Sequence, residues 1–132
     1  MIARSFVVVA CLATASLAFA QTPAPADWPM YSRDYQSTGY SPLTSINPSN
    51  VSKLKQVCSY EIPETVTFES SVVTIAGIMY FTTPEYTYAI DAGTCALKWR
   101  VHHEMKGPAG IVRGVAISGT RLFRGFRDGT MA

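Results

Sequence analysis

Beyond its first twenty residues the sequence has no long hydrophobic run, very little net charge and only two cysteines. Because no long hydrophobic run follows residue 20, we expect no transmembrane helix in the rest of the chain. Of the 11 basic residues only Arg4 lies in the first twenty, which leaves 10 basic against 9 acidic residues. This balance argues against nucleic acid or an anionic membrane as the main partner. The sequence also lacks a glycine-rich phosphate loop and a serine-nucleophile motif.

The first twenty residues have the pattern of a secretory signal peptide. Arg4 is their only charge, an apolar run follows it, and Ala18 and Ala20 give the small-x-small pattern of a cleavage site. We therefore expect residues 1–20 to be removed and the protein to be periplasmic or secreted. The alternative is a lipoprotein signal with an acylated Cys11, although few apolar residues precede that cysteine.

Cleavage leaves 112 of the 132 residues, with two cysteines, Cys58 and Cys95. In an exported chain, two cysteines are more often joined in a disulfide than used as metal ligands or catalytic thiols. Cys95 also occupies a turn position at which the chain would most easily take a positive φ, where glycine is the usual residue. Two independent buried thiols remain the alternative.

The chain divides into a linker segment, residues 21–56, and a β-rich part, residues 57–132. The linker segment is rich in Pro, Ser, Asn and Gly, and only residues 47–54 favour a short helical turn, after a Ser or Asn cap. No pattern predicts a long helix. The β signals predict strands at 57–62, 72–75, 78–82, 86–90, 96–101, 112–117 and 121–126, with turns at 76–77, 91–94 and 118–119.

The two hairpins at 72–82 and 112–126 repeat at an offset of 42 residues, as in Ile75 and Ile117 or Phe81 and Phe123. A repeat of about 40–45 residues with four short strands is typical of a β-propeller blade. We therefore predict an all-β fold, a partial β-propeller of about one and a half four-stranded blades. Because such a unit exposes two apolar sheet faces, we expect the chain to be the start of a longer protein. A complete β-sandwich is the alternative.

The turn after residue 90 carries the pattern Ala-x-Asp-x-x-Thr-x-x-x-x-Trp, formed by Ala89, Asp91, Thr94 and Trp99. It resembles the tryptophan-docking motif of propellers of the pyrroloquinoline quinone (PQQ) enzymes. Asp91 and Thr94 are suited to close the turn through side-chain hydrogen bonds to the backbone. Trp99 is then expected to pack its ring against the neighbouring blade.

The linker segment strengthens this resemblance, with Trp28, Asp34, Tyr-Ser-Pro-Leu at 40–43, Ile-Asn at 46–47 and Asn-Val-x-x-Leu at 50–54. Together these residues resemble the N-terminal part of quinoprotein alcohol dehydrogenases. The resemblance implies a periplasmic eight-bladed propeller that binds PQQ with a calcium or lanthanide ion. It implies oxidation of an alcohol or sugar by hydride transfer to the quinone, with an electron acceptor such as a cytochrome c.

The resemblance also implies two cofactor-binding residues, Glu69 and Arg113. An offset of 42 maps position 69 onto 111, two residues before Arg113, so both sites share strand parity. We expect both near the start of an innermost strand, at the same mouth of the propeller channel. Arginine suits the carboxylates of PQQ. The alternatives are that Glu69 is simply an exposed charge and that Arg113 has no site role.

Cys58 lies where the family often has tryptophan, and Cys95 replaces the turn glycine. Because both departures occur together in an oxidising compartment, we expect a Cys58–Cys95 disulfide. Gly107 and Pro108 stand where many members have two adjacent cysteines. The family's metal ligands and catalytic aspartate follow in later blades, so no catalytic or metal-binding residue is assigned here. The missing adjacent cysteines and the presence of Cys95 in the docking motif favour the alternative function, a non-catalytic propeller that serves as an envelope protein-binding scaffold.

The remaining charged side chains are predicted to be solvated. His102 and His103 lack further ligands at metal-binding spacing, so we expect surface imidazoles. Arg121, Arg124 and Arg127 recur every third residue, so on a strand they do not share one face. We expect all three to be solvated charges rather than a nucleic-acid patch.

Overall fold

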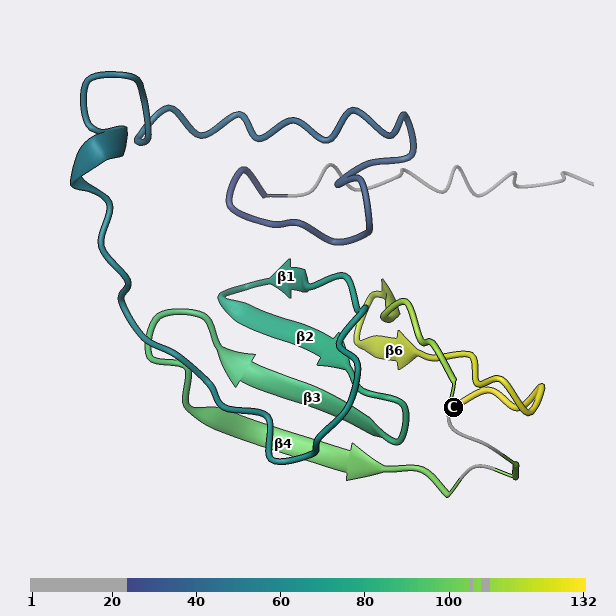
Figure 1. Cartoon of the computed structure of the whole chain (residues 1–132). Coiled ribbons are helices and arrows are strands. Elements are labelled where there is room, and N and C mark those ends of the chain that lie inside the picture. Colours follow the sequence, from purple (N-terminus) through teal and green to yellow (C-terminus); the bar gives the residue numbers. More distant parts are fainter. Residues whose placement is uncertain (1–23, 105, 108–109) are drawn as a thin grey trace, which may run out of the picture.

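The computed structural model describes residues 24–104, 106–107 and 110–132. Four strands form one antiparallel sheet in chain order: β1 (Val73–Ile75), β2 (Ile78–Thr82), β3 (Tyr86–Asp91) and β4 (Leu97–His102) (Figure 1). A second sheet consists of β5 (Ala116–Ser118) and β6 (Arg121–Phe123). This is one four-stranded blade followed by the first hairpin of another, so the predicted all-β architecture is confirmed. In the described ranges no helix is long and apolar enough to cross a membrane.

One predicted strand is absent, two are half as long as predicted, and the strand predicted at 72–75 begins one residue later. Residues 57–62 form no strand, although their burial alternates with a period of two. Cys58, Tyr60 and Ile62 are the partly buried positions, because this stretch crosses the face of the sheet and does not pair with an edge. Residues 112–115 and 124–126 likewise lie outside β5 and β6. In residues 57–62 the alternation therefore indicates which side chains are covered, whereas residues 124–126 do pair, through backbone hydrogen bonds to residues 130–132.

The turn of the second hairpin also differs from the repeat. In the first hairpin Ala76 and Gly77 both have positive φ, 50° and 75°, and Ile75 pairs with Ile78. The equivalent turn was predicted at 118–119, but Ser118 pairs with Arg121, so the turn lies at Gly119 and Thr120. Only Gly119 has a positive φ there, 58°. A β-branched threonine resists positive φ, and a turn with glycine first avoids that strain.

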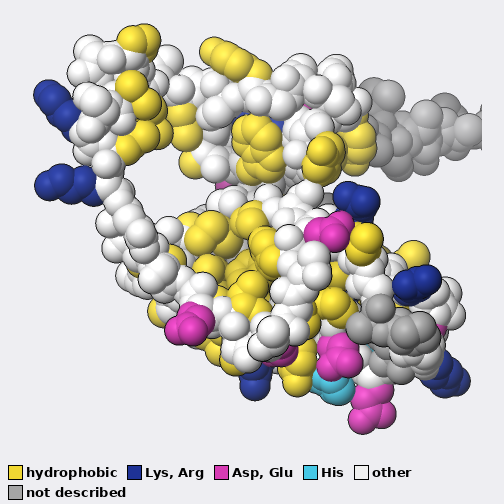
Figure 2. All heavy atoms as spheres, in the orientation of Figure 1, with side chains coloured by type: hydrophobic (Ala, Val, Ile, Leu, Met, Phe, Trp, Pro, Cys, Tyr) yellow, Lys and Arg dark blue, Asp and Glu magenta, His cyan; other side chains and the backbone are white. Residues whose placement is uncertain are grey.

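The strand register divides the first sheet into two faces. Tyr80, Ala89 and Trp99 lie opposite one another on the face toward β5–β6, and Phe81, Tyr88 and Arg100 on the other. Phe81, Tyr88 and Ile90 form the buried cluster of this second face, where the Phe81 and Tyr88 rings stack at 5.0 Å. Residues 57–68, here called the covering segment, pack Tyr60, Ile62 and Phe68 against that cluster. In Figure 2 hydrophobic side chains gather over the middle of the sheet, with charged ones around it.

The linker segment reaches the sheet at Trp28. The N–H of Trp28 donates to the carbonyl oxygen of Thr74 (2.7 Å), and the N–H of Thr74 donates to that of Trp28 (2.9 Å). Asp27 Oδ1 accepts a hydrogen bond from the N–H of Ala76 (2.9 Å). These bonds cover the outer edge of β1, which would otherwise present unpaired backbone groups. Farther along, the predicted helical turn is the 3-10 helix η1 (Val51–Lys53), preceded by Asn50.

Candidate functional site

The two residues predicted to bind the cofactor lie just before the first strand of each hairpin. Glu69 precedes β1 and Arg113 precedes β5, and both side chains are exposed. The N–H of Ser71 donates to the carbonyl oxygen of Arg113 over 3.3 Å. The fold therefore brings together two segments whose charged residues are 44 positions apart in the sequence. Among the described residues no carboxylate is paired with Arg113, whose guanidinium is available to an anionic ligand.

A glycine allows these two segments to approach. Gly114 has a φ of 117°, a conformation that residues with a side chain rarely adopt. A Cβ atom at this position would lie 3.0 Å from the carbonyl oxygen of Ser71 and 3.6 Å from Ser70 Oγ. Both the backbone angle and the close contact therefore favour glycine beside Arg113.

Ser70 fastens the segment that follows Glu69 to the end of β2. Its Oγ accepts a hydrogen bond from the N–H of Thr82 (2.9 Å) and another from Thr82 Oγ1 (3.0 Å). Thr82 is 1% exposed, so these bonds form away from solvent. Leaving a buried polar group without a hydrogen bond costs free energy, so these bonds hold Ser70 against the end of β2.

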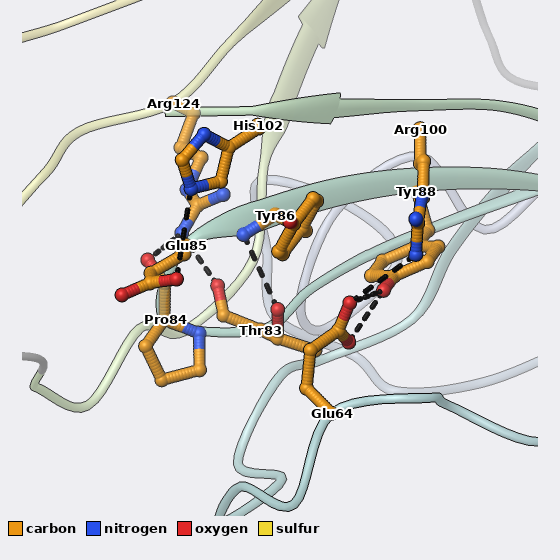
Figure 3. Close-up of polar contacts among 9 residues, drawn as sticks. All are labelled: Glu64, Thr83, Pro84, Glu85, Tyr86, Tyr88, Arg100, His102 and Arg124. Carbon is orange, nitrogen blue, oxygen red and sulfur yellow. Dashed lines mark hydrogen bonds and ion pairs between the residues drawn. The ribbon is translucent and has the colours of Figure 1, made fainter. Parts of the chain in front are cut away.

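Arg124 is a residue that sequence reasoning placed wrongly. It was predicted to be solvated, but it is 2% exposed. Its Nη2 donates to the carbonyl oxygens of Thr83 (2.6 Å) and Pro84 (2.7 Å) (Figure 3). Its Nη1 donates to Thr87 Oγ1 (2.9 Å). The guanidinium also lies 4.4 Å from the centre of the Phe126 ring. The second hairpin thus inserts a cation into the loop between β2 and β3.

The burial of Arg124 has a clear electrostatic consequence. Burial lowers the pKa of its guanidinium to about 10, so it remains charged at neutral pH. A buried charge is tolerated only when it is hydrogen-bonded, and three acceptors bind the two Nη atoms of Arg124, whereas its buried Nε has no partner among the described residues. No sequence signal separates Arg124 from the exposed Arg121 and Arg127, because its acceptors come from a loop some forty residues away.

The turn after β3 is closed by Asp91. Asp91 Oδ1 accepts hydrogen bonds from the N–H groups of Gly93 and Thr94 (both 3.1 Å) and from Thr94 Oγ1 (3.0 Å). Lys98 Nζ lies 3.1 Å from Asp91 Oδ2. The Lys98 ammonium, with these donors, lowers the pKa of Asp91 to about 2. A carboxylate that accepts several hydrogen bonds in one turn holds the two strands in register.

Trp99 extends from β4 toward the second hairpin. It lies opposite Ala89, and its ring centre is 6.0 Å from that of Tyr80. With Ile117 and Leu122 it lines an open cavity of about 240 Å³ between the first sheet and β5–β6. The tryptophan of the motif therefore faces the neighbouring hairpin.

Cys95 takes a positive φ of 57° in the same turn and is bonded to Cys58. The sulfur atoms are 2.07 Å apart and the Cα atoms 5.7 Å apart. This disulfide links the covering segment to the turn between β3 and β4. A thiol at a position that favours glycine is thus explained by its partner, since the cross-link compensates for the strain of the backbone.

A second attachment of the covering segment lies on the face away from Arg124. The hydroxyl of Tyr88 donates to the Glu64 carboxylate (2.6 Å to Oε1), and Arg100 Nη1 lies 3.4 Å from the same oxygen (Figure 3). Burial, with the hydrogen bond to Glu64, raises the pKa of Tyr88 well above its usual value. Tyr88 therefore stays a neutral donor at all ordinary pH values.

The two histidines lie at the end of β4 and beside the second hairpin. His102 Nε2 is 3.6 Å from the Glu85 carboxylate and is exposed. His103 is partly buried, because its ring stacks on Phe126 at 3.6 Å. His103 keeps 29% of its side chain exposed, so it lies at the surface but is partly covered by Phe126. In the described ranges no group of three or more His, Cys, Asp or Glu side chains is placed to hold a metal ion.

Comparison with known proteins shows the family. The model of the glucose/ethanol/alcohol dehydrogenase β-propeller domain matches residues 28–124. The chain belongs to this family of PQQ-dependent dehydrogenase propellers, so the resemblance seen in the linker segment and docking motif is confirmed. The family also excludes the β-sandwich alternative.

Two curated relatives and one solved structure illustrate the match. The chain is 29% identical to a 1-butanol dehydrogenase (cytochrome c) of Thauera butanivorans over 98% of its own length and 20% of the relative's. It is 34% identical to a quinohemoprotein alcohol dehydrogenase of Comamonas testosteroni, over 85% and 16%. A quinohemoprotein alcohol dehydrogenase of Pseudomonas putida HK5 superposes with a TM-score of 0.72 at 28% identity, over 81% and 17%. The chain thus spans a fifth or less of these proteins.

Proposed function

We propose that this chain is the N-terminal part of an exported quinoprotein dehydrogenase that oxidises alcohols or sugars. The observation that carries the proposal is the meeting of the Glu69 and Arg113 segments at one end of two neighbouring hairpins. Membership of the dehydrogenase propeller family supports the reaction class. The substrate range of the relatives supports an alcohol as the first substrate to test.

The residues at this end fit PQQ. PQQ carries carboxylates, and an exposed guanidinium at Arg113 offers them charge-assisted, bidentate hydrogen bonds. Glu69 is an exposed acceptor for donors of the ring or of bound water. When bound, PQQ supplies the quinone that takes up the electrons of the substrate. In this proposal a calcium or lanthanide ion and a cytochrome c acceptor complete the full-length protein.

The reaction is tested on the full-length exported protein, reconstituted with PQQ and either Ca²⁺ or a lanthanide ion. We expect reduction of an artificial electron-accepting dye that depends on PQQ and on an added alcohol or sugar. Arg113→Gln should weaken PQQ binding about tenfold or more, because a charge-assisted contact is lost. Arg121→Gln, which removes an exposed arginine of β6, is the matched control and should leave binding unchanged. Absence of PQQ-dependent dye reduction with every alcohol and sugar would refute the proposal.

Export is a separate part of the proposal. The signal-peptide pattern supports cleavage after Ala20, so the mature protein should begin at Gln21. Mass spectrometry of the protein from a periplasmic extract measures this directly. A mature chain that begins with a lipid-modified Cys11, or an uncleaved chain, would contradict it.

The alternative function is a scaffold propeller that binds other envelope proteins. Two sequence features favour it: Gly107 and Pro108 replace the adjacent cysteines that many members carry before the arginine, and Cys95 replaces the turn glycine of the docking motif. A scaffold would not bind PQQ. A direct PQQ titration therefore separates the two functions without requiring the right substrate.

A further inference from the structure

Arg124 belongs to a closed chain of contacts that includes both segments of the proposed cofactor site. We call this chain the Arg124 ring, and its members are Arg124, Thr83, Thr82, Ser70, Ser71 and Arg113. From Arg124 a hydrogen bond leads to the carbonyl oxygen of Thr83, next to Thr82. The polypeptide itself, which runs from Arg113 through β5 and β6 to Arg124, closes the ring.

The other half of the ring runs past Glu69. Thr82 donates two hydrogen bonds to Ser70 Oγ, and Ser70 directly follows Glu69. The next residue, Ser71, donates its N–H to the carbonyl oxygen of Arg113. The two proposed cofactor contacts are thus attached to the same ring, one before each hairpin.

The two attachments differ in the number of their hydrogen bonds and in the charge of the donor. The direct bond between the two segments, from Ser71 to Arg113, spans 3.3 Å, longer than the usual backbone distance. Arg124 makes three bonds of 2.6, 2.7 and 2.9 Å, all with a charged donor. Hydrogen bonds with a charged partner are about twice as strong as neutral ones. Arg124 therefore does more than the direct bond to hold the second hairpin against the first.

We propose that Arg124 is a positioning residue that fixes the separation between Glu69 and Arg113, with Ser70 as its counterpart on the first hairpin. This inference rests on the proposed function, since it requires that both residues contact PQQ. Arg124 itself does not touch the cofactor. It sets the geometry in which the guanidinium of Arg113 and the carboxylate of Glu69 meet one ligand.

The test is a PQQ titration of the full-length protein freed of cofactor, followed by the absorbance of PQQ. Arg124→Lys keeps the charge but loses the planar fork that reaches three acceptors, and we expect PQQ affinity to fall about tenfold. Thr87→Val removes one acceptor at nearly constant volume, with an expected loss of about threefold. Ser70→Ala, on the other side of the ring, should lose a similar factor. Arg121→Lys, three residues before Arg124 and exposed, is the matched control and should not change affinity.

Two further variants separate positioning from general stability. Tyr88→Phe removes the bond to Glu64 on the opposite face of the sheet, so it should lower the unfolding temperature without changing PQQ affinity. The double variant with Arg124→Lys and Arg113→Gln should bind PQQ less than twofold more weakly than Arg113→Gln alone, because Arg124 acts through Arg113. If Arg124→Lys does not fold, Thr87→Val and Ser70→Ala supply the affinity measurement.

The outcomes are distinguishable. If the unmodified protein does not bind PQQ, the proposed function fails and this inference fails with it. If it binds PQQ and the ring variants bind equally tightly, the inference is overturned while the function stands. An equal loss in Tyr88→Phe, or full additivity with Arg113→Gln, would also overturn it, because a general loss of stability would then explain the effect.

Discussion

The hairpins β1–β2 and β5–β6 share a sequence repeat but lie in different surroundings. The first is extended by β3 and β4, with the covering segment on one face and β5–β6 on the other. The second faces Trp99 with Ile117 and Leu122, whereas Ala116 and Phe123 on its opposite face are exposed. Repeat-equivalent residues therefore differ in burial: Phe81 is 5% exposed and Phe123 37%. The repeat encodes strands and turns, and neighbouring layers determine burial.

The largest expected effect comes from truncating these two phenylalanines. Phe81→Ala should lower the free energy of unfolding by about 3–5 kcal/mol, because it removes a ring stacked on Tyr88 and leaves a cavity. Phe123→Ala, its repeat equivalent, should cost about 1 kcal/mol or less, since the ring is already partly solvated. Denaturant unfolding of both variants measures the difference. Equal losses would show that the second hairpin is covered as well as the first.

The disulfide is the next largest difference, because it ties only the first sheet to its covering segment. Cys58→Ser should lower the free energy of unfolding by about 3–4 kcal/mol, from the lost constraint on a loop of sequence separation 37. Cys58→Ser with Cys95→Gly should recover about 1 kcal/mol of that loss, since glycine suits the positive φ. Unfolding with and without reductant measures both effects. If reductant leaves the stability of the unmodified protein unchanged, the disulfide does not form.

Gly114 tests the contact between the two hairpins. Gly114→Ala should cost about 1–3 kcal/mol, because the backbone has a φ of 117° and the new Cβ would lie 3.0 Å from the Ser71 carbonyl oxygen. Gly125→Ala, where a Cβ would meet nothing within 4 Å, should be nearly neutral. Thermal unfolding compares the two. A neutral Gly114→Ala would mean that the segments are not in close contact there.

The smallest expected effect is a loss of folding stability at acidic pH. Asp91 and Asp128 both have a pKa lowered from 3.8 to about 2, Asp91 mainly by Lys98 and Asp128 mainly by Thr130. A lowered folded-state pKa gives stability that is present above pH 4 and lost as the pH falls toward 2. Asp91→Asn should flatten this loss for the first sheet, and Asp128→Asn should do so for the second hairpin. Unfolding temperatures between pH 2 and 5 measure it, and an unchanged slope in both variants would contradict it.

Much of this comparison could be predicted from local sequence. The period-two pattern and the turn residues gave both hairpins and the strands β3 and β4, because alternation and turn chemistry act over a few residues. The positive φ at Cys95 could also be predicted, because the turn geometry requires it. The resemblance pointed to Glu69 and Arg113, and both lie at the same end because each precedes the first strand of its hairpin.

What could not be predicted depends on contacts distant in sequence. Residues 57–62 alternate like a strand, but the same alternation arises when a segment lies across a sheet face. The burial of Arg124 depends on carbonyl oxygens of Thr83 and Pro84, which no local pattern reveals. The turn at Gly119 and Thr120 differs from its repeat equivalent because threonine resists the positive φ that Gly77 adopts at the same place in the first hairpin.

The central claim is that the segments just before β1 and β5 together bind PQQ through Glu69 and Arg113. The most direct measurement is a crystal structure of the full-length protein soaked or purified with PQQ. The account predicts the Arg113 guanidinium within hydrogen-bond distance of a PQQ carboxylate and Glu69 beside the same cofactor. PQQ bound elsewhere, or in contact with neither residue, would contradict it.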